Sequence, residues 1–140
     1  MSSESAWEDQ LIADARAHGG RPSSGPLAGH PLLIMYNKGA KSGERRRAIL
    51  TWSRDGEDYI VAGTKGGAPT DPAWVHNIEA DPNVSVEIGA ETFPAVATIV
   101  TDDERQRLWD QHVAALPWFA EYPAKAGRVI PVIRLRPQQG

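Results

Sequence analysis

The sequence predicts a mainly β, α+β domain in which an antiparallel sheet curls into a small barrel with short helices at its edges. The expected order of elements is helix, three strands, helix, two strands, helix, strand, so hairpins dominate. One hairpin is marked by Asp55-Gly56, a pair that favours the turns matching strand twist. The expected helices are few and short. A doubly wound parallel sheet is therefore not expected.

Length and composition limit the function classes. A chain of 140 residues has room for one hydrophobic core. It contains no cysteine, which excludes disulfides and thiolate chemistry, and its four histidines show no metal-ligand spacing. A net charge of −3 argues against nucleic acid, whose binding domains are usually strongly basic. Without a signal peptide or a membrane-spanning run, we expect a cytoplasmic protein with no metal site.

Residues 1–30 are expected to form a helix and a connector. Ser5-Ala6-Trp7-Glu8 has the form of a capping box, and Trp7, Leu11 and Ala15 recur on one narrow apolar face. Gly19-Gly20 should end this helix. It is interpreted either as packing on the domain or as a lid or membrane-surface helix, so peripheral membrane association stays open.

Residues 31–137 are expected to form the barrel. Apolar runs or apolar–polar alternation predict the strands, and Pro94 within one of them indicates an edge or a bulge. The predicted strands are Pro31–Tyr36, Arg47–Trp52, Tyr59–Ala62, Val84–Ile88, Thr92–Val100 and Ile130–Leu135.

Two further helices are predicted from their start signals. Asp71-Pro72 provides an N-cap followed by a proline at the first helical position, and this helix should end near Asp81-Pro82. Thr101-Asp102-Asp103-Glu104 resembles a capping box, and Pro117 should end the helix that follows it. Residues 118–128 are predicted to be a loop.

A basic, glycine-flanked turn is the most unusual segment of the chain. Five of the 15 lysines and arginines lie in residues 38–47, beside the single acid Glu44. Glycines flank Lys41-Ser42, so the backbone can approach a ligand closely. The segment is either an anion-binding cradle or a solvated turn. Alternation predicts that Arg45 and Arg47 share one face of the strand, opposite to Arg46.

A second glycine-rich turn, Gly63–Gly67, ends another predicted strand. On the helix after it, Trp74 and Asn77 lie one turn apart and point the same way. Trp74 is interpreted either as a core residue or as a ligand contact, and His76 as a structural histidine.

Five motifs in order resemble the deazaflavin-dependent nitroreductase family. They are Gly39-x-Lys41-Ser42-Gly43-x-x-Arg46, Gly66-Gly67-Ala68-Pro69, Pro72-x-Trp74-x-His76-Asn77, Asp81-Pro82 and Arg128-x-Ile130-Pro131-Val132. The resemblance covers roughly residues 32 to 135. It implies a split β-barrel, similar to FMN-binding split barrels, that binds the deazaflavin coenzyme F420.

The resemblance also implies which residues bind the coenzyme. Lys41 and Arg46 would contact its phosphate and polyglutamate tail, which suits a cationic cluster in an acidic protein. Ser42 and Gly43 would shape the turn, whereas the second glycine-rich turn, Trp74 and Asn77 would lie along the deazaflavin. The full implied set is Lys41, Ser42, Gly43, Arg46, Ala48, Ile49, Ala62, Gly63, Thr64, Lys65, Gly66, Gly67, Trp74 and Asn77.

The implied reaction is hydride transfer from reduced F420 to an electron-poor small molecule: a quinone, a nitro compound or an activated alkene. By similarity, Thr64 would hydrogen-bond the acceptor and Tyr122 would border it. The family often has a second tyrosine where Phe119 stands, next to Trp118, which puts nitroimidazole reduction in doubt.

Three other functions stay open at this point: an FMN-dependent split-barrel oxidoreductase, a non-catalytic F420 carrier, and an interaction protein that uses the basic turn. A homodimer is also left open.

Overall fold

The protein forms a single antiparallel sheet whose two edges are adjacent in sequence. The computed structural model describes residues 3–25, 27–64 and 68–138. Its seven strands are ordered β2-β1-β5-β6-β7-β4-β3, and every neighbouring pair is antiparallel. The edge strands β2 (Arg45–Thr51) and β3 (Ser53–Asp55) are separated only by Trp52. Because one continuous segment supplies both edges, the sheet must curl on itself, which confirms the predicted split-barrel fold.

The remaining elements follow the predicted order. They are α1 (Ser3–Ala17), β1 (Leu32–Lys38), β4 (Asp58–Ala62), α2 (Ala73–Ala80), β5 (Asn83–Ile88), β6 (Glu91–Ile99), α3 (Glu104–Ala115), the 3₁₀ helix η2 (Pro117–Glu121), α4 (Tyr122–Ala126) and β7 (Val132–Pro137).

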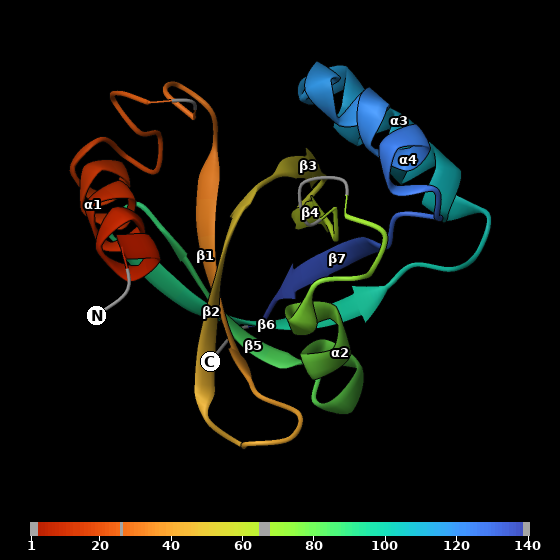
Figure 1. Cartoon of the computed structure of the whole chain (residues 1–140), viewed down its shortest axis with the longest axis horizontal. Coiled ribbons are helices and arrows are strands. Elements are labelled where there is room, and N and C mark those ends of the chain that lie inside the picture. Colours follow the sequence, from red (N-terminus) through yellow and green to blue (C-terminus); the bar gives the residue numbers. More distant parts are fainter. Residues whose placement is uncertain (1–2, 26, 65–67, 139–140) are drawn as a thin grey trace.

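The helices cover different parts of the sheet (Figure 1). Helix α1 lies at one side, α3 and α4 lie together at the opposite side, and α2 lies beside the β1–β2 hairpin. In the part of the chain that the structure describes, no helix combines the length and the apolar character needed to cross a bilayer.

Alternation along the strands divides the apolar side chains between two cores. On β4, Val61 packs in the main cluster with Ile133 and Leu135 of β7. The neighbouring side chain, Ile60, points to the other face and packs in a second cluster with Val132. Successive strand residues face opposite sides, so one sheet buries both faces. The main core lies within the barrel and is covered by α2, and the second core lies under α3, η2 and α4.

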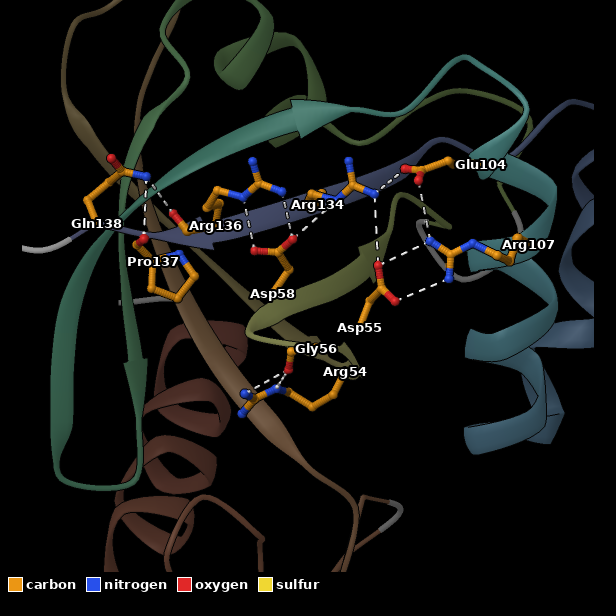
Figure 2. Close-up of polar contacts among 10 residues, drawn as sticks. All are labelled: Arg54, Asp55, Gly56, Asp58, Glu104, Arg107, Arg134, Arg136, Pro137 and Gln138. Carbon is orange, nitrogen blue, oxygen red and sulfur yellow. Dashed lines mark hydrogen bonds and ion pairs between the residues drawn. The ribbon is translucent and has the colours of Figure 1, made fainter.

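An ion-pair network fastens the β3–β4 hairpin to β7 and α3 (Figure 2). Arg134 stands at its centre, with its Nε 3.4 Å from Asp58 and its Nη2 bonded to Glu104. Nη1 and Nη2 of Arg107 donate to Oδ1 and Oδ2 of Asp55, at 3.1 and 3.2 Å. This pairing lowers the pKa of the Asp55 carboxyl. Charges on the strands and the helix alternate in sign, so these ion pairs add to the apolar contacts that the second core makes between β4, β7 and α3.

The helix starts differ from the predictions. Ser5 lies inside α1, so it is not the N-cap of a capping box. Residue Pro72 is the N-cap of α2, because the carboxylate of Asp71 is bound to Arg128 instead. At α3 the carboxylate of Asp102 accepts the Glu104 N–H at 3.0 Å, so the Thr101–Glu104 box is not formed.

Three other predictions were wrong in detail. Trp7 is 54% exposed, and the buried face of α1 carries Ile12 and Ala15. Residues 118–128 contain η2 and α4 and are not a simple loop. Pro94 was predicted to mark an edge or a bulge, but it lies on the inner strand β6 and the register there has no bulge. The pairing of β6 with β7 starts at the next residue, Ala95.

Candidate functional site

A cleft of about 930 Å³ lies between the β1–β2 hairpin and α2. The hairpin contributes Lys41, Ser42 and Arg46 to its lining. Helix α2 contributes Ala73, Trp74, His76 and Asn77. This volume is in the range of pockets that hold cofactors and drug-sized ligands. The cleft therefore joins the basic turn to the helix, two features that were predicted separately from the sequence.

Asn77 fixes the position of the basic turn against α2. Its Oδ1 accepts the backbone N–H of Ala40 at 2.9 Å, and its Nδ2 donates to Asn37 Oδ1 at 2.8 Å. Both asparagine side chains are buried. Since buried amides need partners, these bonds hold the hairpin at one distance from the helix. Asn77 thus lines the cleft, and its amide is already engaged within the protein.

The turn itself closes through its own backbone. The Gly39 N–H donates to Glu44 O at 2.8 Å, and the Gly43 N–H donates to Gly39 O at 2.9 Å. Gly43 has φ +71°, which favours glycine. Ser42 Oγ accepts the Glu44 N–H at 3.1 Å. Because the N–H groups of Gly39, Gly43 and Glu44 are used within the turn, they are not available to an anion.

The cations of the turn divide between two faces, as alternation predicts. Lys41 and Arg46 line the cleft. Arg47 also contributes to the lining, but its guanidinium pairs with α1, 2.9 Å from Asp9 and 3.4 Å from Glu8, and the Asp9 carboxylate raises the pKa of Arg47. Arg45 stacks over the Tyr36 ring at 4.0 Å. The local positive charge directed to the cleft is thus smaller than the sequence count implies.

Arg46 is available to an incoming anion. Its nearest carboxylate is Glu44, at 3.3 Å, and both side chains are more than half exposed. Exposed pairs of this kind are worth at most about 1 kcal/mol, so a ligand can replace Glu44 at little cost.

Helix α2 supplies an aromatic and a titratable group. Trp74 lines the cleft and is also packed against the main core, so a contact with a ligand stays a prediction beside its packing role. His76 was interpreted from the sequence as a structural histidine. Its side chain is 64% exposed at the cleft, 3.5 Å from Glu79.

The second glycine-rich turn begins against α2. A Cβ on Gly63 would come within 2.8 Å of Val75 Cγ2, so only glycine lets the strand end approach the helix this closely. Thr64 is half-buried and lies outside the lining of the cleft. Lys65, Gly66 and Gly67 are outside the described residues. Sequence reasoning gave no role to Arg128, although its motif was noted; its guanidinium contacts Gly63, Thr64, Ala68 and Asp71.

The other predicted residues are spread around the site. Ala48 and Ala62 are buried in the main and second cores respectively. Ile49 pairs with Ile34 and is not among the residues that line the cleft. Gly43 lies at a shallow groove on the opposite side of the hairpin.

Tyr122 belongs to an aromatic cluster at the second core. Its ring packs edge-on against Phe119, with centroids 5.2 Å apart. Phe119 is buried and also contacts Trp118 and His112. Tyr122 is half-buried and lies outside the lining of the cleft. The structure therefore brings the predicted coenzyme-contacting cations together with Trp74 and Asn77, but places Tyr122 in a different cluster.

Comparison with known proteins places this site in a family. Residues 10–137 match the model of the F420H(2)-dependent quinone reductase family. The chain belongs to this family. An F420H(2)-dependent quinone reductase of Mycobacterium tuberculosis (strain H37Rv) is 34% identical over 108 residues, covering 75% of this chain and 72% of that protein.

Solved structures agree with the family assignment. An F420-H2-dependent reductase, FDR-A, is 36% identical with a TM-score of 0.69, covering 76% of this chain and 94% of that chain. A protein described as a domain-swapped dimer is 30% identical with a TM-score of 0.71, covering 96% of this chain and all of that chain. The predictions of a split-barrel oxidoreductase and of F420 as its coenzyme are confirmed.

The described residues fit this coenzyme. Lys41 and Arg46 supply cations for an anionic tail, and Trp74 supplies a flat apolar surface in the same cleft. No group of three or more metal-ligating side chains occurs among the residues that the structure describes.

Proposed function

We propose that this protein reduces a small quinone with F420H2, and that the coenzyme's anionic part binds in the cleft between the β1–β2 hairpin and α2. The observation that carries this proposal is the pairing of Lys41 and Arg46 with Trp74 in one cleft of about 930 Å³, in a member of this family. The relative from M. tuberculosis is named a quinone reductase, which supports a quinone as the acceptor class.

The proposed roles follow from where the residues lie. Lys41 and Arg46 bind the phosphate and carboxylates of the coenzyme, and Trp74 packs against an apolar part of it. Asn77 keeps the hairpin at the right distance through the Ala40 N–H. We place the coenzyme-binding domain in residues 31–137. Residues 1–30, which include α1, are proposed to be an addition to that domain.

The chemistry is a two-electron reduction. When bound, the reduced deazaflavin supplies a hydride, and a proton completes the conversion of quinone to hydroquinone. The protein orients the acceptor and keeps water out. Thr64, at the start of the second glycine-rich turn, is proposed to hydrogen-bond an acceptor oxygen. Tyr122, half-buried against Phe119, is proposed to border the acceptor.

The test is a fluorescence titration of the purified protein with F420 and, separately, with FMN, followed by turnover of F420H2 with a soluble benzoquinone. We expect the protein to bind F420 with micromolar or tighter affinity and not to bind FMN. F420H2 should be oxidised only when quinone is present. Preference for FMN would contradict the proposed coenzyme. Binding of F420 without turnover of any quinone or nitro compound would indicate a carrier.

We also propose that the chain forms a homodimer. The 30% identical domain-swapped dimer matches 96% of this chain. Light scattering after size-exclusion chromatography measures the mass in solution, and a monomer at all concentrations would contradict this proposal.

A further inference from the structure

Arg128 contacts the chain on both sides of the second glycine-rich turn. It lies between α4 and β7, and its side chain is 14% exposed. Before the turn, its Nη2 donates to Gly63 O at 3.1 Å and to Thr64 O at 3.2 Å. After the turn, its Nε donates to Ala68 O at 3.0 Å and its Nη1 to Asp71 Oδ1 at 2.6 Å. One guanidinium therefore ties together both ends of residues 63–71.

Only arginine can make this set of contacts. Its guanidinium holds five N–H donors in one rigid plane, whereas lysine directs three donors from a single point. The acceptors are three backbone carbonyls and one carboxylate, which come from four different residues. A lysine at this position would keep the charge near Asp71 and would lose most of the bonds to the carbonyls.

These bonds orient the peptide groups of the turn. Because a peptide is planar and trans, the Gly63 carbonyl that faces Arg128 turns the Thr64 N–H to the opposite side. The ion pair also holds Asp71 at the start of α2, a helix without a side-chain N-cap bond. Trp74 lies in the first turn of this helix, so the position of one cleft wall depends on the same guanidinium.

We propose that Arg128 is a positioning residue for the reaction: it sets the orientation of the Gly63–Thr64 backbone and of the first turn of α2, and thereby the wall that the coenzyme and the acceptor meet. This inference rests on the proposed function. Arg128 itself reaches backbone carbonyls and Asp71, so it acts through the turn.

The test compares R128A, R128K and D71N with the wild type. R54A is the matched control, because Arg54 also donates to a backbone carbonyl, that of Gly56, but on the exposed β3–β4 hairpin. For each variant we would measure F420 affinity, kcat/KM for benzoquinone, the melting temperature, and hydrogen exchange of peptides covering residues 60–75.

We expect R128A to weaken F420 binding and to lower kcat/KM by about tenfold or more each, with faster exchange in residues 60–75 and unchanged exchange in β5 and β6. Millimolar guanidinium ion should restore part of the activity of R128A and none of R128K, because only the alanine variant leaves room for it. D71N should show a smaller loss, and R54A none.

Two results would overturn the proposal. The first is an F420 affinity and a kcat/KM of R128A that both lie within about twofold of the wild-type values. If R128A does not fold, R128K is used for this comparison. The second is hydrogen exchange in residues 60–75 of R128A that equals that of the wild type. This measurement tests the positioning role even if the wild type binds no F420. Wild-type protein that binds no F420, together with faster exchange in R128A, would refute the proposed function and keep the positioning role.

Discussion

Acid should destabilise this protein through one buried histidine. His112 of α3 is fully buried, its Nδ1 lies 2.7 Å from Ser53 Oγ, and its ring packs on Phe119. Its Nε2 has no hydrogen-bond partner among the described residues. Burial lowers the pKa of His112 from 6.5 to about 4, because a charged imidazolium cannot be solvated there.

The sign of the effect follows from proton binding. In the unfolded chain His112 takes up a proton as the pH falls below 6.5, whereas in the folded protein it stays neutral until about pH 4. The unfolded state therefore binds more protons in this window, and stability falls as the pH falls. Two and a half pKa units correspond to about 3 kcal/mol in full, of which about 2 kcal/mol is lost between pH 8 and pH 5.

The assay is urea unfolding at intervals from pH 8 to pH 5, on the wild type and on H112Q. Glutamine can still bond Ser53 and has no charge to gain, so H112Q should lose most of the slope over this range. The bidentate pair with Arg16 lowers the pKa of Glu87, so this buried carboxylate stays charged throughout the pH range of the assay. The variant H18Q, which removes an exposed histidine, is the control. Equal slopes for the wild type and H112Q would refute the reasoning.

Three further predictions concern the cleft and the proposed acceptor side. Replacing Lys41 and Arg46 by glutamate should weaken F420 binding by more than about tenfold and flatten its salt dependence, measured by fluorescence titration, with R54E as control; unchanged affinity would move the anion site elsewhere. Y122F should change quinone turnover in steady-state assays while F420 affinity stays nearly intact, and a large loss of affinity would contradict the assigned role. N77A should cost about 1 to 3 kcal/mol in urea unfolding, because the Ala40 N–H and Asn37 lose a buried partner, and should also weaken F420 binding; wild-type stability would show that the hairpin is held by other contacts.

Local sequence signals were sufficient for the strands, the hairpin at Asp55-Gly56 and the end of α1 at Gly19-Gly20, because alternation and turn chemistry depend on neighbouring residues. The basic turn and the α2 helix were also found, together with the cleft residues Lys41 and Trp74. The family was recognisable because its motifs are contiguous in sequence.

Helix starts were less predictable, since long-range partners compete for the capping side chains. Asp71 has the right type and spacing for an N-cap, but Arg128, 57 residues later, binds its carboxylate. Glu104 was expected to complete a capping box and instead bonds Arg134. In each case a charge-assisted bond to a distant arginine is stronger than a local cap.

By itself, the sequence determined most of the elements, the barrel class, the family and its coenzyme, because each is encoded in short-range patterns and ordered motifs; β3, η2 and α4 were not predicted. Only the tertiary structure decided which cations at the cleft are already paired with another element. Arg46 and Arg47 both line the cleft, but Arg47 pairs with Glu8 and Asp9 on α1, whereas Arg46 meets the exposed Glu44 of its own turn. It also decided that His112 is buried and that His76 is exposed. Burial and ion pairing depend on which distant segments pack together, and no local pattern contains that information.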